Sequence, residues 1–232
     1  MERIQREIAR EARFVDDLPF DPDRIDAPDG PLVAGVDQAF LDDRAVSAVV
    51  VLRGGQVVER AGAVSPLSIP YVPGLLAFRE GGPILDALAE LDVDPDLYLF
   101  DGSGRIHFRE AGLATHIGVL VDQPAIGVAK SLLCGRPRES VDGLPAGARV
   151  PIEADDRMET PDGTVVGYAY QSRQFDSGRI NPLYVSPGHR VDAATAVDCV
   201  AACGGEYKLP EPTRLADAHA DELKADAERA GD

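Results

Sequence analysis

Several residue types are scarce in this chain of 232 residues. It has no tryptophan, three cysteines, and only three lysines among its 23 basic residues, namely Lys130, Lys208 and Lys224. Three cysteines are too few for the disulfide framework of a small secreted protein, and they lack the further His or Cys partners that a zinc site needs. The sequence therefore predicts a protein of a reducing cytoplasm.

Long apolar stretches are also absent. The longest largely apolar stretch is residues 45–52, far shorter than the about 20 residues that a membrane helix needs. Residues 1–7 are charged and amphipathic, whereas a signal peptide has an apolar segment near its start. We therefore expect neither a membrane span nor secretion.

Acidic residues are abundant. Forty acidic residues stand against 23 basic ones, for a net charge of −17 at pH 7. Such a chain repels phosphates at low ionic strength, which argues against a nucleic-acid partner. Surface Asp in place of Lys is also typical of proteins adapted to concentrated salt, where the Debye length falls to about 3 Å. We favour salt adaptation, under which the net charge does not exclude a nucleic-acid substrate and activity tolerates high salt.

Turn residues and apolar patterns divide the chain, as one domain over residues 1–232, into an ordered series of elements. A helix over 1–14 and an acidic linker over 16–31 come first, and residues 134–151 are predicted to be a loop. The expected strands are 32–40, 45–52, 56–64, 97–100, 125–129, 164–172 and 182–186, and the expected helices are 73–91, 110–120, 191–203 and 212 to about 230. The order predicts an α/β fold, a mixed sheet in which three antiparallel strands are followed by helix-linked parallel strands, with flanking helices.

Four acidic residues stand out by position: Asp37, Glu80, Asp101 and Asp217. Asp101 ends an apolar strand and precedes a glycine, the place where open α/β sheets bind ligands. Converging carboxylates raise one another's pKa unless a cation neutralises them, and Mg²⁺ or Mn²⁺ prefers oxygen ligands. In a chain with 40 acids, the spacing alone also fits ordinary caps, turns and solvated helix faces.

Longer motifs identify a family that the chain resembles. They are Pro70 with 71–80 (YVPGLLAFRE), 101–104 (DGSG) with His107 and Arg109, 112–118 (GLATHIG), 126–131, 185–189 and 210–214. Over roughly residues 32–220 these segments resemble the endonuclease V family, in the family's order. The resemblance implies a ribonuclease H-like fold and a DNA-repair endonuclease that recognises hypoxanthine, as inosine or deoxyinosine. It further implies cleavage of the second phosphodiester bond on the 3′ side, leaving 3′-hydroxyl and 5′-phosphate ends.

The same resemblance implies the chemical roles. Asp37, Glu80 and Asp101 match the family's metal-binding acids, and Asp217 matches a fourth position that is Asp or His. Lys130 matches a lysine near the scissile phosphate, where it neutralises developing charge. The implied cofactor is Mg²⁺, with Mn²⁺ as an alternative. The implied partner is DNA containing deoxyinosine, with RNA as an alternative, and a monomer is expected.

Substrate contacts are implied in the same way. Tyr71, between Pro70 and Pro73, matches a wedge that enters the space left by a flipped base. The other matching positions are Gly74, Leu76, Gly102 and Gly104 for the base pocket, and His107 and His116 near the site. His189, at the end of the matching segment 185–189, is a candidate to bind phosphate from a helix amino terminus or to cap that helix. Each also has a structural interpretation: a core tyrosine, a glycine turn, a helix start, or a histidine that only packs or caps.

Some features depart from the family pattern. Phe108 stands where a proline is common, Gly81 and Gly82 follow Glu80 with poor helix formers, and residues 136–162 resemble the family weakly. Two other functions remain open at this point. One is an inosine-specific RNA endonuclease, and the other is a module that binds inosine without cutting, in which the acids are surface features.

Overall fold

The first three strands form the antiparallel meander that the sequence predicts. In this computed structural model, which describes residues 1–70, 72, 74–174 and 181–231, β1 (Val33–Leu41) pairs with β2 (Arg44–Arg53), and β2 with β3 (Gln56–Pro66). Gly54 and Gly55 turn the chain between β2 and β3 with φ of 52° and 74°, a left-handed conformation that costs glycine little. The predicted bounds of the three strands are correct to within two residues.

The parallel part of the sheet begins at β1. β4 (Leu97–Asp101) runs parallel beside β1, and β5 (Ala125–Ala129) runs parallel beside β4. Helices α2 (Leu76–Leu88) and α3 (Leu113–Val121) precede β4 and β5 and bring the chain back across the sheet. The order β3-β2-β1-β4-β5 is that of a ribonuclease H-like fold, which confirms the predicted fold class.

Four more strands continue the sheet beyond β5, all antiparallel to their neighbours. In spatial order they are β9 (Leu183–His189), β8 (Val165–Tyr170), β7 (Arg149–Glu153) and β6 (Arg136–Pro137). The prediction of a loop over 134–151 is therefore wrong where β6 and the start of β7 lie. Glycine, proline and arginine dominate that segment and mask the short alternation that buries Val150 and Ile152.

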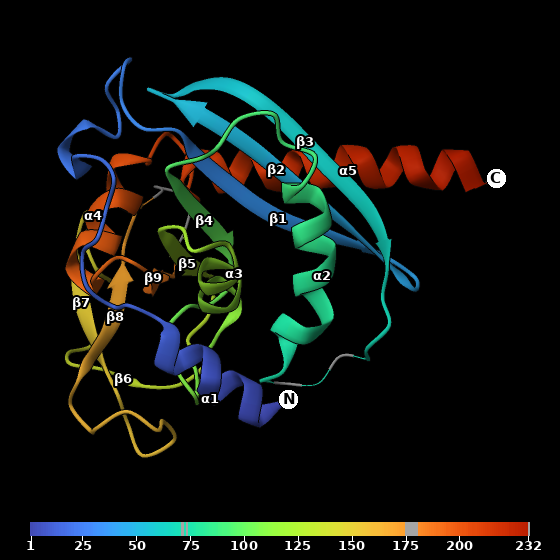
Figure 1. Cartoon of the computed structure of the whole chain (residues 1–232). Helices are drawn as coiled ribbons and strands as arrows, with labels where there is room; N and C mark the ends of the chain where they lie inside the picture. The colour runs from blue at the N-terminus through green and yellow to red at the C-terminus, as the bar shows by residue number, and fades with distance from the viewer. Residues whose placement is uncertain (71, 73, 175–180, 232) are drawn as a thin grey trace.

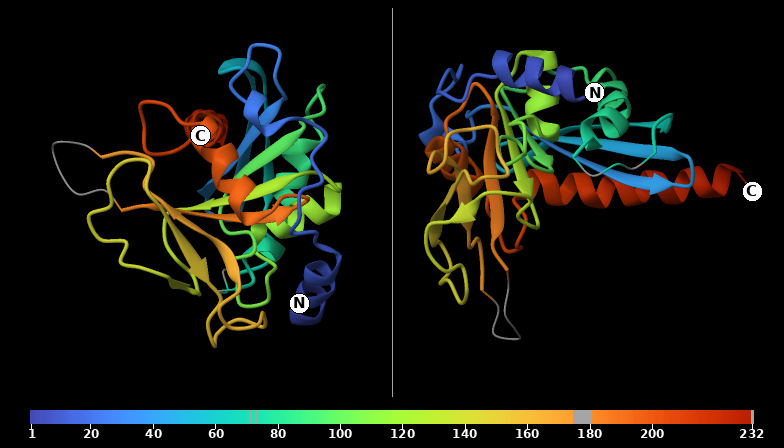
Figure 2. Two further views of the ribbon diagram at one scale, coloured as in Figure 1. Left: turned by 90° about the vertical axis from the view of Figure 1, so that its left-hand side faces the viewer. Right: turned by 90° about the horizontal axis from the view of Figure 1, so that it is seen from below.

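Helices cover both faces of the sheet (Figures 1 and 2). On one face α2 and α3 pack on the strands, and α1 (Glu2–Glu11) packs against α3. On the other face lie α4 (Ala193–Ala202) and the long α5 (Glu211–Gly231), whose last turns extend beyond the strands in Figure 1. Within the described ranges, none of the helices combines the length and apolar character that a membrane crossing requires.

The segment predicted as a linker packs on the folded core through Ile25. It contains a short 3-10 helix, η1 (Pro22–Arg24), whose preceding Asp21 caps it by accepting a hydrogen bond from the Asp23 amide. Ile25 then enters the core beside Val33, with only 4% of its surface exposed. One buried isoleucine in an otherwise acidic stretch gave no periodic signal.

Strand alternation determines where the acids point. Val36 and Phe100 lie in the core cluster beneath α2 and α3, whereas Val33 and Leu99 lie in the cluster beneath α4. Because side chains alternate between faces along a strand, Asp37 lies on the α4–α5 side of β1. Asp101, the last residue of β4, lies on the same side.

Candidate active site

Asp37 and Asp101 are neighbours because of the strand register. β1 and β4 are parallel and Val36 pairs with Phe100, so the residues that follow lie side by side on adjacent strands, with backbones about 5 Å apart. Asp37 Oδ1 also accepts a hydrogen bond from the Gln38 amide at 2.8 Å. The fold thus brings together two carboxylates that are 64 residues apart in the chain.

Asp217 joins them because Gly35 lets α5 approach β1. A Cβ at position 35 would lie 2.0 Å from the Pro212 carbonyl carbon, so only glycine fits there. From Gly35 to Asp37 the strand advances about 7 Å, and from Thr213 to Asp217 the helix advances about 6 Å. The two advances match, and the carboxyl groups of Asp37 and Asp217 share a hydrogen bond.

Glu80 approaches the same strands from α2, on the opposite face of the sheet. Its side chain is buried, with 8% of the residue exposed. Gln38 fixes the helix at this point, since its Nε2 donates to Ser47 Oγ at 2.6 Å and to the Glu80 carbonyl at 3.3 Å. The charge of Asp101 acts on Glu80, which places the two carboxyl groups in one electrostatic cluster.

Lys130 brings a positive charge into this cluster. It follows β5 directly, and its Nζ lies 2.6 Å from Asp101 Oδ2. Burial disfavours its charge, but the hydrogen bond and charge of Asp101, with the charges of Asp37 and Asp217, raise the pKa of Lys130 above its ordinary value. The half-exposed ammonium is therefore charged at neutral pH and available to a ligand at the surface.

The acids repel one another strongly. Burial, the adjacent Asp101 charge and the hydrogen bond with Asp217 raise the pKa of Asp37 to about 8. Burial also raises the pKa of Glu80 to about 7, with Asp101 adding to the effect and Arg79 opposing it. One lysine does not compensate four carboxyl groups, so the site favours either protons or an added cation.

The donor chemistry suits a hard divalent cation. All four side chains offer carboxylate oxygen, the ligand that Mg²⁺ and Mn²⁺ prefer. Across the described part of the chain, no three or more His, Cys, Asp or Glu side chains already stand in a metal-binding arrangement. Asp101 is held by Lys130 and Asp37 by Asp217, so a cation would have to replace these contacts.

The glycine-rich loop after β4 packs tightly on the sheet. Gly102 has φ of 153°, and a Cβ on Gly104 would lie 2.3 Å from the Pro187 carbonyl oxygen. The Gly104 amide donates to Ser186 Oγ at 2.9 Å and that of Gly102 to the Val128 carbonyl at 3.4 Å. Both glycines thus allow close packing next to Asp101, and both amides have protein partners.

Gly74 forms the turn before α2 and lies against the segment that follows Asp101. Its φ is 75°, and a Cβ there would lie 3.5 Å from the Phe108 ring. Leu76 is half-buried at the start of α2, and Pro70 is exposed. The predicted wedge residue Tyr71 and its neighbour Pro73 lie outside the described residues.

Two of the predicted histidines lie close to this turn. His107 Nε2 donates to the Gly74 carbonyl at 3.2 Å, and its Nδ1 accepts from the Arg109 amide at 3.2 Å. Burial lowers the pKa of His107 to about 4, so the ring is neutral. His116 is buried in α3, with Nδ1 on the Ala111 carbonyl at 3.2 Å and the Phe78 ring against its edge.

His189 is not brought to the acids. It pairs with Ala125 at the amino end of β5, about 16 Å along the strand from Lys130. Its Nε2 donates to Asp122 Oδ1 at 3.1 Å, and its Nδ1 accepts from the Arg13 amide at 3.2 Å. These bonds use both ring nitrogens to join α3 and the amino-terminal segment to β9, away from the acid cluster.

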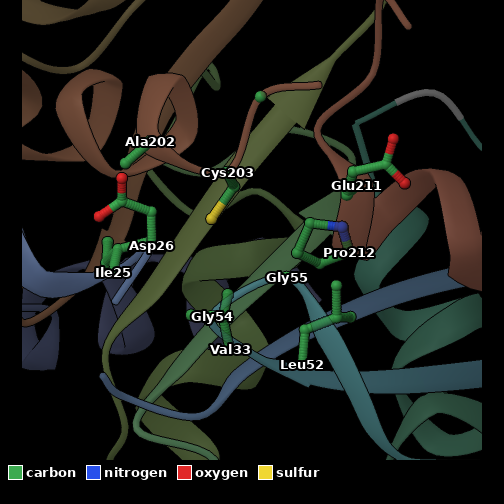
Figure 3. A pocket seen from close by; sticks show the side chains of 11 residues that line it. Ile25, Asp26, Val33, Leu52, Gly54, Gly55, Ala202, Cys203, Glu211 and Pro212 are labelled. Carbon is green, nitrogen blue, oxygen red and sulfur yellow. The ribbon is translucent and has the colours of Figure 1, made fainter. Parts of the chain in front are cut away.

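A separate hollow of about 170 Å³ lies beside the start of α5 (Figure 3). Cys203 points into it, with Asp26 and Glu211 at its sides, and apolar residues such as Val33 and Leu52 form its wall. None of the four acids lines it. The acid cluster and this hollow therefore lie in different places.

Sequence reasoning missed two glutamines, the buried Gln5 and the half-buried Gln38, that hold the site's elements together. Gln38 holds α2 on β1 and β2, and Gln5 in α1 contacts the Gly74 turn. Gln5 and Ile8 form the buried face of α1, whereas Ile4 is 41% exposed. A polar residue on the inward face of an amphipathic helix is the signal that would have found Gln5.

Several known proteins are similar to this chain in sequence and in fold. The family model for Endonuclease V matches residues 21–218. An endonuclease V from Natronomonas pharaonis is 73% identical over 226 residues, which cover 97% of this chain and 91% of the relative, and this halophilic relative fits the salt-adapted composition.

Two solved structures are also similar. The endonuclease V of Streptomyces avermitilis superposes with a TM-score of 0.81 at 37% identity, covering 97% of this chain and 92% of that one. The endonuclease V of Ciona intestinalis, in complex with a 24mer DNA containing an inosine followed by a ribo-adenosine, superposes with a TM-score of 0.77 at 27% identity. That match covers 97% of this chain and 96% of the other.

Proposed function

Because the chain belongs to the endonuclease V family, we propose that it hydrolyses nucleic-acid strands next to deaminated purines, with hypoxanthine in DNA as its substrate base. The scissile bond is the second phosphodiester on the 3′ side, and the products carry 3′-hydroxyl and 5′-phosphate ends. The observation that carries the proposal is the pairing of β1 with β4, which sets Asp37 beside Asp101. Two adjacent carboxylates beside a charged lysine are suited to phosphate-ester hydrolysis.

A divalent cation completes this site. Asp37, Asp101, Glu80 and Asp217 would hold it, and the raised pKa values of Asp37 and Glu80 support a site that lacks positive charge. When bound, Mg²⁺ or Mn²⁺ supplies Lewis-acid stabilisation of the negative charge on the reacting phosphate. Lys130 supplies a second, protein-borne positive charge, which Asp101 orients toward the same place.

The base is held next to the acids. Gly74, in the turn just before α2 and Leu76, lies against the segment that follows Asp101, as its hydrogen bond with His107 and its contact with Phe108 indicate. We assign the flipped base to this junction, with Tyr71 as the wedge between Pro70 and Pro73. His116, buried behind Phe78, would shape the pocket from α3.

One assay tests the proposal. Matched DNA strands with and without a single inosine are incubated in molar KCl with Mg²⁺ or with EDTA, and the products are mapped. We expect a single nick at the second bond 3′ to inosine, only with Mg²⁺. Cutting that is equal on both strands, or that persists in EDTA, would contradict the proposal. Tight inosine-dependent binding without a nick would instead support the non-catalytic binding module.

RNA is the second candidate substrate. The Ciona intestinalis complex contains a ribo-adenosine after the inosine, which favours a site that accepts a 2′-hydroxyl at that position. The same assay with inosine-containing RNA, and with DNA carrying one ribonucleotide after inosine, separates the two. Faster cutting of both ribose-containing strands than of DNA would assign the enzyme to RNA.

A further inference from the structure

Gln5 in α1 joins the amino-terminal helix to the Gly74 turn. Its side chain Nε2 donates to the Gly74 carbonyl at 2.7 Å, and its Oε1 accepts from Arg109 Nη1 at 3.1 Å. Only 1% of Gln5 is exposed. A buried amide whose donor and acceptor each bind a different segment fixes those segments relative to each other.

The same Gly74 carbonyl has a second donor. His107 Nε2 lies 3.2 Å from it, while His107 Nδ1 accepts from the Arg109 amide. Gln5 and the neutral His107 therefore hold one carbonyl from two sides, and Arg109 contacts both of them. The four residues form a closed polar network, which we call the Gly74 clamp.

The Gly74 clamp connects the two segments that carry the acids. Gly74 precedes Glu80 by six residues at the start of α2, and His107 follows Asp101 by six residues. A change in the clamp therefore shifts the turn that leads into Glu80 and the loop that leaves Asp101. The Gly74 carbonyl thus accepts from one side chain of α1 and from one side chain of the segment after Asp101.

We propose that Gln5 is a positioning residue of the nuclease, which holds the Gly74 turn and so sets how strongly the site prefers inosine to an ordinary purine. The inference rests on the proposed function. It makes α1, which lies outside the matched range 21–218, a working part of the catalytic unit. The other contacts of α1 include exposed ion pairs such as Arg6–Glu159, which molar salt screens, whereas the buried Gln5 bonds are insensitive to salt.

The experiment compares Gln5→Leu, Gln5→Glu and a control, Arg3→Gln, in the full chain. Gln5→Leu removes both hydrogen bonds. Gln5→Glu keeps an acceptor for Arg109 and loses the donor to the Gly74 carbonyl. Glu at this position also keeps α1 attached should the Leu variant not fold. Arg3 is on the same helix with its side chain 84% exposed, so its substitution leaves the clamp intact.

Two measurements are made on each protein. Single-turnover cleavage rates on strands with inosine and with guanine give the base preference, and amide hydrogen exchange of residues 74–80 reports on the turn without any substrate. We expect both Gln5 variants to lose about tenfold in base preference and to exchange faster at 74–80, because small displacements of a reacting group cost rate steeply. Arg3→Gln should match the wild type in both.

The outcomes separate the inference from the proposed function. Gln5 variants with wild-type preference and exchange would overturn the inference, as would an equal loss of rate on both strands, which a merely structural role produces. A wild-type protein that cuts no inosine strand would refute the proposed function, and unchanged exchange in its Gln5 variants would then also refute the clamp.

Discussion

Acidic and basic side chains gather at both ends of β5, but their charges are balanced at only one of the two ends. At the carboxyl end, Lys130 is the basic member of a cluster with Asp37, Asp101 and Asp217, and carboxyl groups there repel one another. At the amino end, His189 is flanked by Asp122 and Arg13, and their hydrogen bonds compensate each other. The compensated end stabilises the fold, whereas the uncompensated end lowers stability and so is suited to bind a cation and a phosphate.

The largest expected effect comes from removing an acid at the uncompensated end. Asp101→Asn should reduce the single-turnover nicking rate on an inosine strand about 1000-fold, because the carboxylate both holds the cation and orients Lys130. The matched control is Asp122→Asn at the compensated end, which should cut within about twofold of the wild type, since exposed ion pairs contribute little. Equal losses in the two variants would erase the contrast between the ends.

The pH dependence of stability sharpens the same contrast. Folded Glu80 keeps its proton up to about pH 7, whereas in the unfolded chain it titrates near 4.5. The folded state thus binds the extra proton, so the stability that Glu80 contributes is present below pH 4.5 and is lost as the pH rises through 7.

We therefore expect Glu80→Gln to raise the free energy of unfolding, relative to the metal-free wild type, more at pH 8 than at pH 5. The difference between the two gains should be on the order of 3 kcal/mol. Urea unfolding in EDTA and molar KCl measures this difference, and saturating Mg²⁺ should reduce it. A stability difference that is the same at both pH values would contradict a raised pKa of Glu80 in the folded protein.

Substitution of Lys130 should have a smaller effect on nicking and an opposite effect on cation binding. Lys130→Met should slow nicking about 10- to 100-fold, because a positive charge near the reacting phosphate is lost. It should also bind Mn²⁺ at least as tightly as the wild type, because Asp101 is freed from its 2.6 Å contact with Nζ. Weaker Mn²⁺ binding in this variant would show that the lysine supports the cation site instead of competing with it.

The smallest effect on catalysis is expected from His189. His189→Phe removes two internal hydrogen bonds and should lower stability by about 1–3 kcal/mol. Its nicking rate at a temperature where it is folded should stay within about twofold of the wild type. A selective loss of nicking would return His189 to the phosphate-binding role that the sequence suggests.

Much of the fold could be predicted because its signals are local. The meander from Val33 to Pro66 has β-branched runs and a Gly54–Gly55 turn, and Asp101 follows a short apolar strand. β6 and β7 could not be predicted, because they are short and lie among glycine and proline residues, which hide any alternation of apolar and polar side chains. Ile25 could not be placed either, since its burial depends on packing across the sheet.

The candidate site was only partly predictable. Asp37 and Asp101 match the family's metal-binding acids, but their adjacency depends on the pairing of β1 with β4, which cannot be read from the sequence. The approach of Asp217 depends on Gly35, which reads as an ordinary strand glycine until α5 packs on it. His189 was placed near the phosphate by its motif, whereas antiparallel pairing of β9 with β5 puts it at the far end of the strand.

The most direct test of the central claim is calorimetric titration of the metal-free protein with Mn²⁺ at pH 7, in two buffers of different ionisation enthalpy. Asp37 and Glu80 have pKa values of about 8 and 7, so cation binding at these acids should release about one proton per ion into the buffer. The account predicts this release in the wild type and its loss in an Asp37→Asn, Asp101→Asn double variant. Binding heats that are independent of the buffer, or equal in the two proteins, would contradict it.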